Sequence, residues 1–72
     1  KDGWQQTNVV EFDNLPGPVK DTIGSNIGGT QVQRIVQMRV GDQTLYQAWD
    51  ARGRTMIVDV SGKVVEPLGD GQ

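Results

Sequence analysis

The sequence predicts an α+β fold, in which one α-helix packs on an antiparallel meander of three to four strands with an additional N-terminal strand, in the order β-α-β-β-β. Apolar residues recur at helical spacing over residues 15–27 and alternate with polar residues over residues 32–66. Ten Val, ten Gly and eight Gln against three Leu and two Ala favour strands and turns over a helical bundle. With 72 residues the chain is expected to form a single domain, 1–72.

The N-terminal region, residues 1–13, contains one candidate strand. Residues 7–12 read T-N-V-V-E-F, which is typical of a strand and places Asn8, Val10 and Phe12 on one face. The pair Asp13-Asn14 is expected to end it.

Residues 15–27 form the helix candidate. One apolar stripe follows from the spacing of Leu15, Val19, Ile23 and Ile27. Proline is tolerated in a first helical turn, and the pair Gly28-Gly29 supplies a stop. Because β-branched residues and Gly24 weaken this helix, we expect it to need a sheet to lie on.

The meander is predicted at Val32–Val40, 44–50, 54–60 and 63–66, followed by a frayed tail at 67–72. Residues 50–54 and 59–63 share the pattern D-x-x-G followed by Arg or Lys. This pattern suits a three-residue hairpin loop with glycine in the left-handed conformation. It would place Asp50 opposite Arg54 and Asp59 opposite Lys63.

A three-residue loop at Gly41-Asp42 is predicted as well, and it sets the register of the first hairpin. The face that would receive the helix then collects Val36, Met38, Val40, Tyr46, Ala48, Met56, Val58 and Val64. Arg34 would lie opposite Asp50 at the rim. A two-residue loop would instead place Val36 opposite Gln47 and Arg34 opposite Trp49, which gives a less consistent apolar face.

The opposite face is expected to mix polar residues with several large apolar ones. The expected apolar members are Ile35, Leu45, Trp49, Ile57 and Val65; the polar members are Gln37, Arg39, Gln47, Thr55 and Asp59. Exposed apolar patches often mark partner sites. The candidate partner-binding residues are Trp49, Ile35, Gln47, Ile57 and Leu45. Trp49 has two interpretations: an aromatic anchor for a partner, or a residue of a second small core covered by the N-terminal segment or Trp4.

The order of several short motifs resembles a known family. The motifs are Leu15-Pro16-x-x-Val19-x-x-x-Ile23, a V-x-x-I strand, Gly41-Asp42 with Leu45-Tyr46-x-Ala48, and Ile57-x-Asp59-x-x-Gly62-Lys63-Val64. Over residues 14–66 the chain is similar to the PepSY and PepSY-like domains of bacterial secreted proteins, which are related in fold to the beta-lactamase-inhibitor-protein repeats. The helix departs from the family pattern, because Gly17-Pro18 and Gly24 weaken it.

The resemblance implies one helix on an antiparallel sheet, a periplasmic or secreted location, and a noncatalytic role in binding or inhibiting proteins, often peptidases. It also implies that the sheet face opposite the helix grips the partner. Residues 1–12 resemble the tail of a preceding unit in tandem members. A structural or self-associating repeat of a larger extracytoplasmic protein is therefore the alternative.

Composition disfavours other classes of function. The chain has no His and no Cys, so neither the commonest general base nor a thiolate is present. We predict no catalytic, cofactor-binding or metal-binding residue, and no enzyme activity. Seven basic against nine acidic residues argue against a nucleic-acid partner, and no apolar run is long enough for membrane insertion. The expected partner is a protein, with a homo-oligomer or a sister repeat as alternatives.

Overall fold

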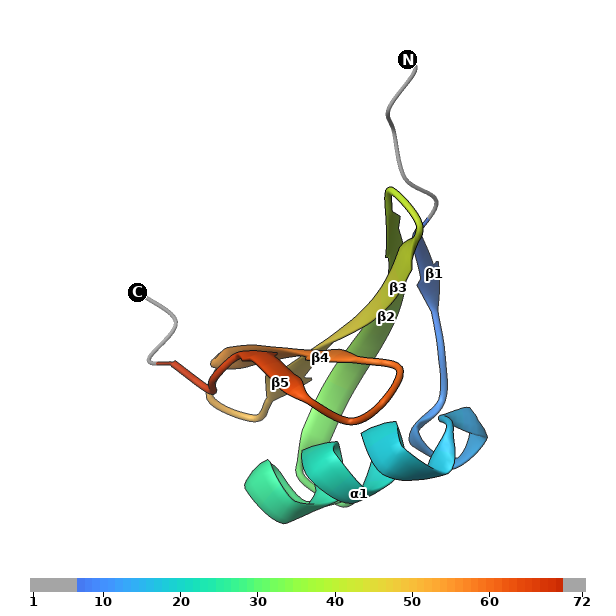
Figure 1. The fold of residues 1–72 in the computed structure, drawn as a ribbon. Coiled ribbons are helices and arrows are strands. Elements are labelled where there is room, and N and C mark those ends of the chain that lie inside the picture. Colours follow the sequence, from blue (N-terminus) through green and yellow to red (C-terminus); the bar gives the residue numbers. More distant parts are fainter. Residues whose placement is uncertain (1–6, 70–72) are drawn as a thin grey trace.

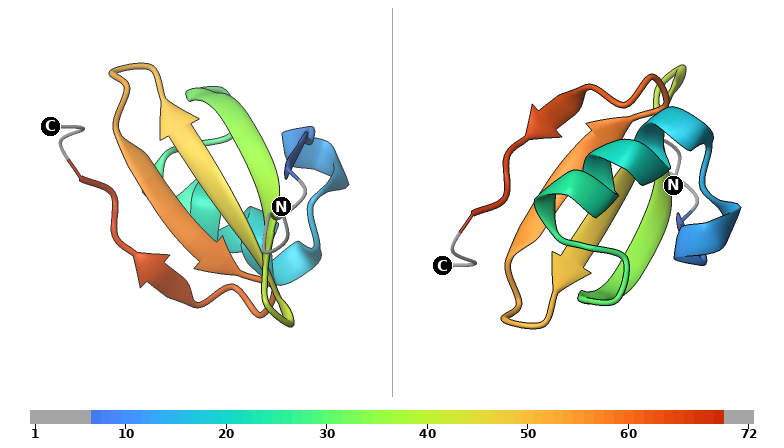
Figure 2. Two further views of the ribbon diagram at one scale, coloured as in Figure 1. Left: turned by 90° about the horizontal axis from the view of Figure 1, so that it is seen from above. Right: turned by 90° about the horizontal axis from the view of Figure 1, so that it is seen from below.

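The structure is a computed structural model that describes residues 7–69. It contains one α-helix packed across one face of a five-stranded antiparallel sheet (Figure 1, Figure 2). The elements are β1 (Thr7–Val9), a 3-10 helix η1 (Phe12–Asn14), α1 (Gly17–Asn26), β2 (Val32–Val40), β3 (Gln43–Asp50), β4 (Thr55–Asp59) and β5 (Val64–Glu66). The strand order β1-β2-β3-β4-β5 follows the chain, and the predicted β-α-β-β-β fold is confirmed.

The core lies between α1 and the sheet. Leu15, Val19 and Ile23 are buried, as the predicted stripe requires, and Ile27 packs partly buried beside them. The sheet contributes five buried side chains to this core: Ile35, Tyr46, Ala48, Met56 and Val58. The helix is shorter than the predicted 15–27. It begins at Gly17 because Pro16 has an extended backbone, and it ends where Gly28 takes a φ of +95°.

One side of α1 contacts the β4–β5 turn directly. The Thr22 hydroxyl donates a hydrogen bond of 2.6 Å to the Gly62 carbonyl oxygen. Gly62 has a φ of +91°, and a Cβ atom there would lie 2.7 Å from the Pro18 carbonyl oxygen. Glycine is therefore required at this position both for its backbone conformation and for the close approach of the helix.

The N-terminal strand is shorter than predicted. β1 ends at Val9, and Phe12 opens η1 instead of extending the strand to residue 12. The Phe12 ring lies over Gly24 and Gly29, where a Cβ atom would come within 3.5 and 3.0 Å of it. Val10 and Phe12 both pack against the core, so the chain turns here in order to place an aromatic ring against the helix.

Both predicted three-residue loops are confirmed. In the β3–β4 loop, Asp50 accepts hydrogen bonds from the backbone N–H groups of Arg52 and Arg54, and Gly53 has a φ of +84°. In the β4–β5 loop, Asp59 accepts the equivalent bonds from the residues two and four positions later. We call Asp50 and Asp59 the loop aspartates, since each carboxylate closes its own loop.

The predicted three-residue loop between β2 and β3 is wrong. Val40 pairs with Gln43, so the loop contains only Gly41 and Asp42. Gly41 has a φ of +62°, whereas no non-glycine residue in the described part of the chain has a positive φ. This combination is typical of a type II′ turn, which needs glycine at its first central position and matches the twist of the two strands.

The shorter turn reverses the two faces of β2. Ile35 lies opposite Ala48 and is 2% exposed in the core, whereas Val36 lies opposite Gln47 on the other face. A bulge between Val32 and Arg34 then brings Val32, and not Arg34, opposite Asp50. The further residues predicted to face the helix, Met38 and Val40, belong to the other face by the same alternation.

The C-terminal segment also differs from its prediction. A bulge in β5 sets Glu66, and not Val65, opposite Ile57. Leu68 packs against the core, and the Gly69 N–H donates to the Thr55 carbonyl oxygen at 3.1 Å. Residues 67–69 are therefore not frayed. Residues 70–72 lie outside the described residues.

Candidate protein-binding face

The candidate site is the sheet face turned away from α1, which we call the outer face. Strand pairing arranges most of its side chains in three rows across the sheet, and Val40 and Gln43 form a further pair beyond them. The middle row is Val9, Val36, Gln47, Ile57 and Glu66. The rows on either side are Arg34, Trp49 and Thr55, and Met38, Leu45 and Asp59. The view from above in Figure 2 looks onto this face, with α1 behind the sheet.

The aromatic centre of this face is Trp49. The Arg34 guanidinium lies over its ring, 5.4 Å from the centroid, at the distance of a cation–π contact. The ring is half-buried and Arg34 is exposed, so part of the indole surface is covered by a side chain that faces solvent. The alternative cover, Trp4, lies outside the described residues.

Four of the five predicted partner-binding residues lie together on the outer face. Leu45, Gln47 and Trp49 come from β3, and Ile57 comes from β4; all four are half-buried. Ile35 does not join them, because the reversal of β2 places it in the core under α1. The contact of these four residues with a partner stays a prediction.

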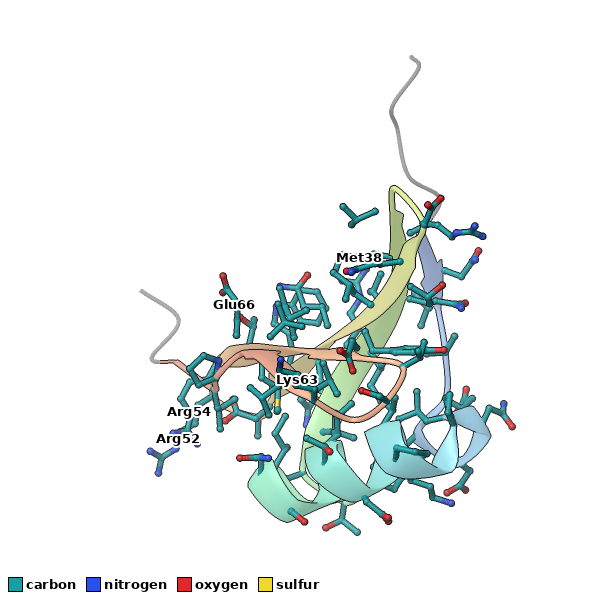
Figure 3. The ribbon with its side chains drawn as sticks, viewed as in Figure 1. Met38, Arg52, Arg54, Lys63 and Glu66 are labelled. Carbon is teal, nitrogen blue, oxygen red and sulfur yellow. The ribbon has the colours of Figure 1, made fainter. Side chains whose placement is uncertain are left out.

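The sequence interpretation missed the contribution of β2 and β1 to this face. Val36 and Met38 lie beside Trp49 and Leu45, and Val9 at the edge is 67% exposed. The signal that finds them is the dipeptide Gly-Asp between two strands, which indicates a two-residue hairpin turn. Met38 and Glu66, from strands far apart in the sheet, extend from the same side of it in Figure 3.

The charges of the outer face are divided between the two sides of the central strand β3. Arg34 lies on β2, while Asp59 and Glu66 lie on β4 and β5. Hydrogen bonds from the Ser61 hydroxyl and the Lys63 backbone N–H lower the pKa of Asp59, so this carboxylate is charged at neutral pH.

Asp50 has a structural role at the end of β3. Its carboxylate accepts a 2.7 Å bond from Arg54 Nε in addition to two backbone bonds. Burial raises the pKa of Asp50, but the hydrogen bonds from Arg54 and Arg52 outweigh this effect and the pKa is lowered. Both arginines extend from the β3–β4 turn in Figure 3. Both carboxylate oxygens of Asp50 are thus used to close the loop.

Within residues 7–69, no cluster of three or more acidic side chains is arranged to hold a metal ion. The same residues contain no helix long and apolar enough to cross a membrane.

Comparison of the chain with protein-family models, with curated proteins and with solved structures finds no match. The resemblance to PepSY domains therefore stays a prediction from the order of the sequence motifs.

Proposed function

We propose that this chain is a noncatalytic protein-binding module that contacts its partner through the outer face. The observation that carries the proposal is the apolar surface around Trp49 on a sheet face that α1 does not cover. A sheet face that only meets solvent is normally polar. Here six of the eleven side chains in the three rows are apolar. Val36 is buried, at 8% exposed, whereas the other five are half-buried or exposed: Val9, Met38, Leu45, Trp49 and Ile57.

The arrangement of this surface supports the same proposal. Trp and Met are enriched in protein interfaces, and energetically dominant residues lie near their centres with polar groups at the rim. Trp49 lies on β3, the central strand; Arg34 lies beside it on β2, and the charged residues Asp59 and Glu66 lie on β4 and β5. Binding through such a face acts sterically and needs no reacting group.

The sequence resemblance extends the proposal to location and target. It supports a periplasmic or secreted protein whose partner is an enzyme, such as a peptidase, that is inhibited by steric blocking. A structural or self-associating repeat of a larger extracytoplasmic protein is the second candidate, and it would use the same face.

The test is affinity capture from periplasmic and secreted fractions, followed by titration of the purified captured protein against variants. Trp49→Ala removes the central aromatic side chain, and Val60→Ala is the matched control because Val60 is 49% exposed in the β4–β5 turn, outside the outer face. We expect Trp49→Ala to weaken binding by about 30-fold or more, the loss typical of a dominant interface residue. Val60→Ala should bind as the unmodified chain does. Equal affinity of a folded Trp49→Ala variant would refute the proposal.

A further inference from the structure

Opposite charges lie at the two sides of the outer face. Arg34 is on β2 and Glu66 is on β5, three strand intervals and one row away, or about 16 Å at the usual strand and residue spacings. Both side chains are exposed. The ion pairs within residues 7–69 join Lys20 to Asp13 and Arg54 to Asp50, and use neither of them.

We infer that the partner of the outer face is a second copy of this chain, packed face to face about a two-fold axis. The inference rests on the proposed function, because it keeps the outer face as the binding surface and assigns a second copy, in place of an enzyme, as the partner of that face. The two-fold axis lies in the plane of the interface, passes midway between Arg34 and Glu66, and is perpendicular to the line that joins them. Rotation about this axis places Arg34 of each copy next to Glu66 of the other copy. The pair therefore forms twice, as symmetry requires of a self-complementary interface.

The same axis places Trp49 and Ile57 near the middle of the interface. The midpoint between Arg34 and Glu66 falls among Trp49, Gln47, Thr55 and Ile57 in the rows of the sheet, of which Trp49 and Ile57 are apolar. Two copies would thus bury their aromatic centres against each other while the ion pairs lie at the rim. Rim charges of this kind mainly set orientation, which is the property the proposed axis requires.

The overall charge and the twist of the sheet are compatible with this packing. The formal net charge of −2 gives little repulsion between copies. The β2–β3 hairpin turns strongly away from β4 and β5 in Figure 1, so the outer face is twisted and not flat. Two twisted sheets pack face to face with their strands crossed.

The size of the face predicts a weak and reversible dimer. Five strands and three rows span about 24 by 20 Å, or about 500 Å² for each copy. The total of about 1,000 Å² lies at the low end for specific interfaces, where complexes are transient. Association should therefore be measured by sedimentation equilibrium over a wide range of protein concentration, from about 10 μM to about 1 mM.

Charge reversal tests the pairing. In Arg34→Glu and in Glu66→Arg, like charges meet twice across the axis, so we expect both variants to be monomeric at concentrations where the unmodified chain dimerises. The double variant Arg34→Glu with Glu66→Arg should dimerise again. An equimolar mixture of the two single variants should form mixed dimers, because each copy then presents charges opposite to those of the other.

A matched control is Arg39→Glu, which makes the same charge change at an exposed position of β2 on the α1 side of the sheet. It should dimerise as the unmodified chain does, and circular dichroism should show every variant folded. The inference is overturned by an unmodified chain that stays monomeric, by single reversals that do not weaken association, or by a mixture that stays monomeric.

Trp49→Ala separates this inference from the proposed function. If the chain is monomeric and captures another protein, and Trp49→Ala abolishes this capture, only the inference of a second copy is overturned. A dimer that is unchanged in folded Trp49→Ala overturns the face-to-face inference, and the proposed function fails separately if Trp49→Ala also leaves capture of other proteins unchanged.

Discussion

The contact between α1 and the β4–β5 turn predicts unequal effects of one substitution in the two equivalent loops. Gly62 and Gly53 occupy the same position in their loops, with φ of +91° and +84°. An alanine with positive φ costs about 1–2 kcal/mol at either position. At Gly62 the new Cβ would also lie 2.7 Å from the Pro18 carbonyl oxygen and 2.9 Å from its Cβ, whereas nothing lies within 4 Å at Gly53. Overpacking of this kind adds about 1–3 kcal/mol.

We therefore expect Gly62→Ala to lower the free energy of unfolding by about 2–5 kcal/mol and Gly53→Ala by about 1–2 kcal/mol. The larger loss is a substantial share of the roughly 4–11 kcal/mol that a domain of this length possesses. Urea unfolding followed by circular dichroism measures both losses, with slopes that show whether unfolding stays two-state. Equal losses in the two variants would refute the close approach of α1 to this turn.

Three further predictions concern contacts at other points of the fold. Thr22→Val removes the hydroxyl that donates to Gly62 and should cost about 0.5–1.5 kcal/mol in urea unfolding, while Thr22→Ser should cost less; equal losses would contradict the bond. Ile35→Ala should lower the free energy of unfolding by about 2–5 kcal/mol and Val40→Ala by less than about 0.5 kcal/mol; the reverse order would support a three-residue loop between β2 and β3. The loop aspartates have a folded-state pKa below the ordinary 3.8, so their stabilisation is complete above that pH and is lost as pH falls through the lower folded-state pKa. Urea midpoints between about pH 5 and about pH 2 should fall, and should fall less in Asp50→Asn; an identical pH dependence in that variant would contradict the assignment.

Local patterns of the sequence were sufficient for much of the fold. The stripe of Leu15, Val19 and Ile23 gave the buried side of α1 because helical spacing alone determines which residues share a face. The loops at residues 50–54 and 59–63 were predictable because the aspartate and the glycine act within their own loop. In both cases the information lies within a few neighbouring residues.

The register of β2 was not predictable from apolar alternation. Its correct pairing places Val36 opposite Gln47 and Arg34 opposite Trp49, which looked unfavourable because it gives a less consistent apolar face. The bulge at Gln33 breaks the alternation, so Val32 and Ile35, which are three residues apart, both lie on the helix side of the sheet. Turn chemistry at Gly41-Asp42 carries more information about register than the apolar pattern does.

The same error determined which part of the candidate site was found. Residues of β3 and β4 were placed correctly because their loops were read correctly, whereas Ile35 was assigned to the outer face in place of Val36 and Met38. The side of a strand on which a residue lies depends on its register, and a shift of one residue exchanges the two sides.

The strands lie in the sheet in the same order as in the chain, and this order affects the folding kinetics. From β2 to β5 each strand pairs with the next one after a short connection, so these hairpins close at small entropic cost. Only the three residues of β1 must wait for the helical crossover before they find β2. We expect the meander to form first and β1 to dock last. The backbone amides of β1 should exchange with deuterium through the opening of the sheet that has the lowest free energy.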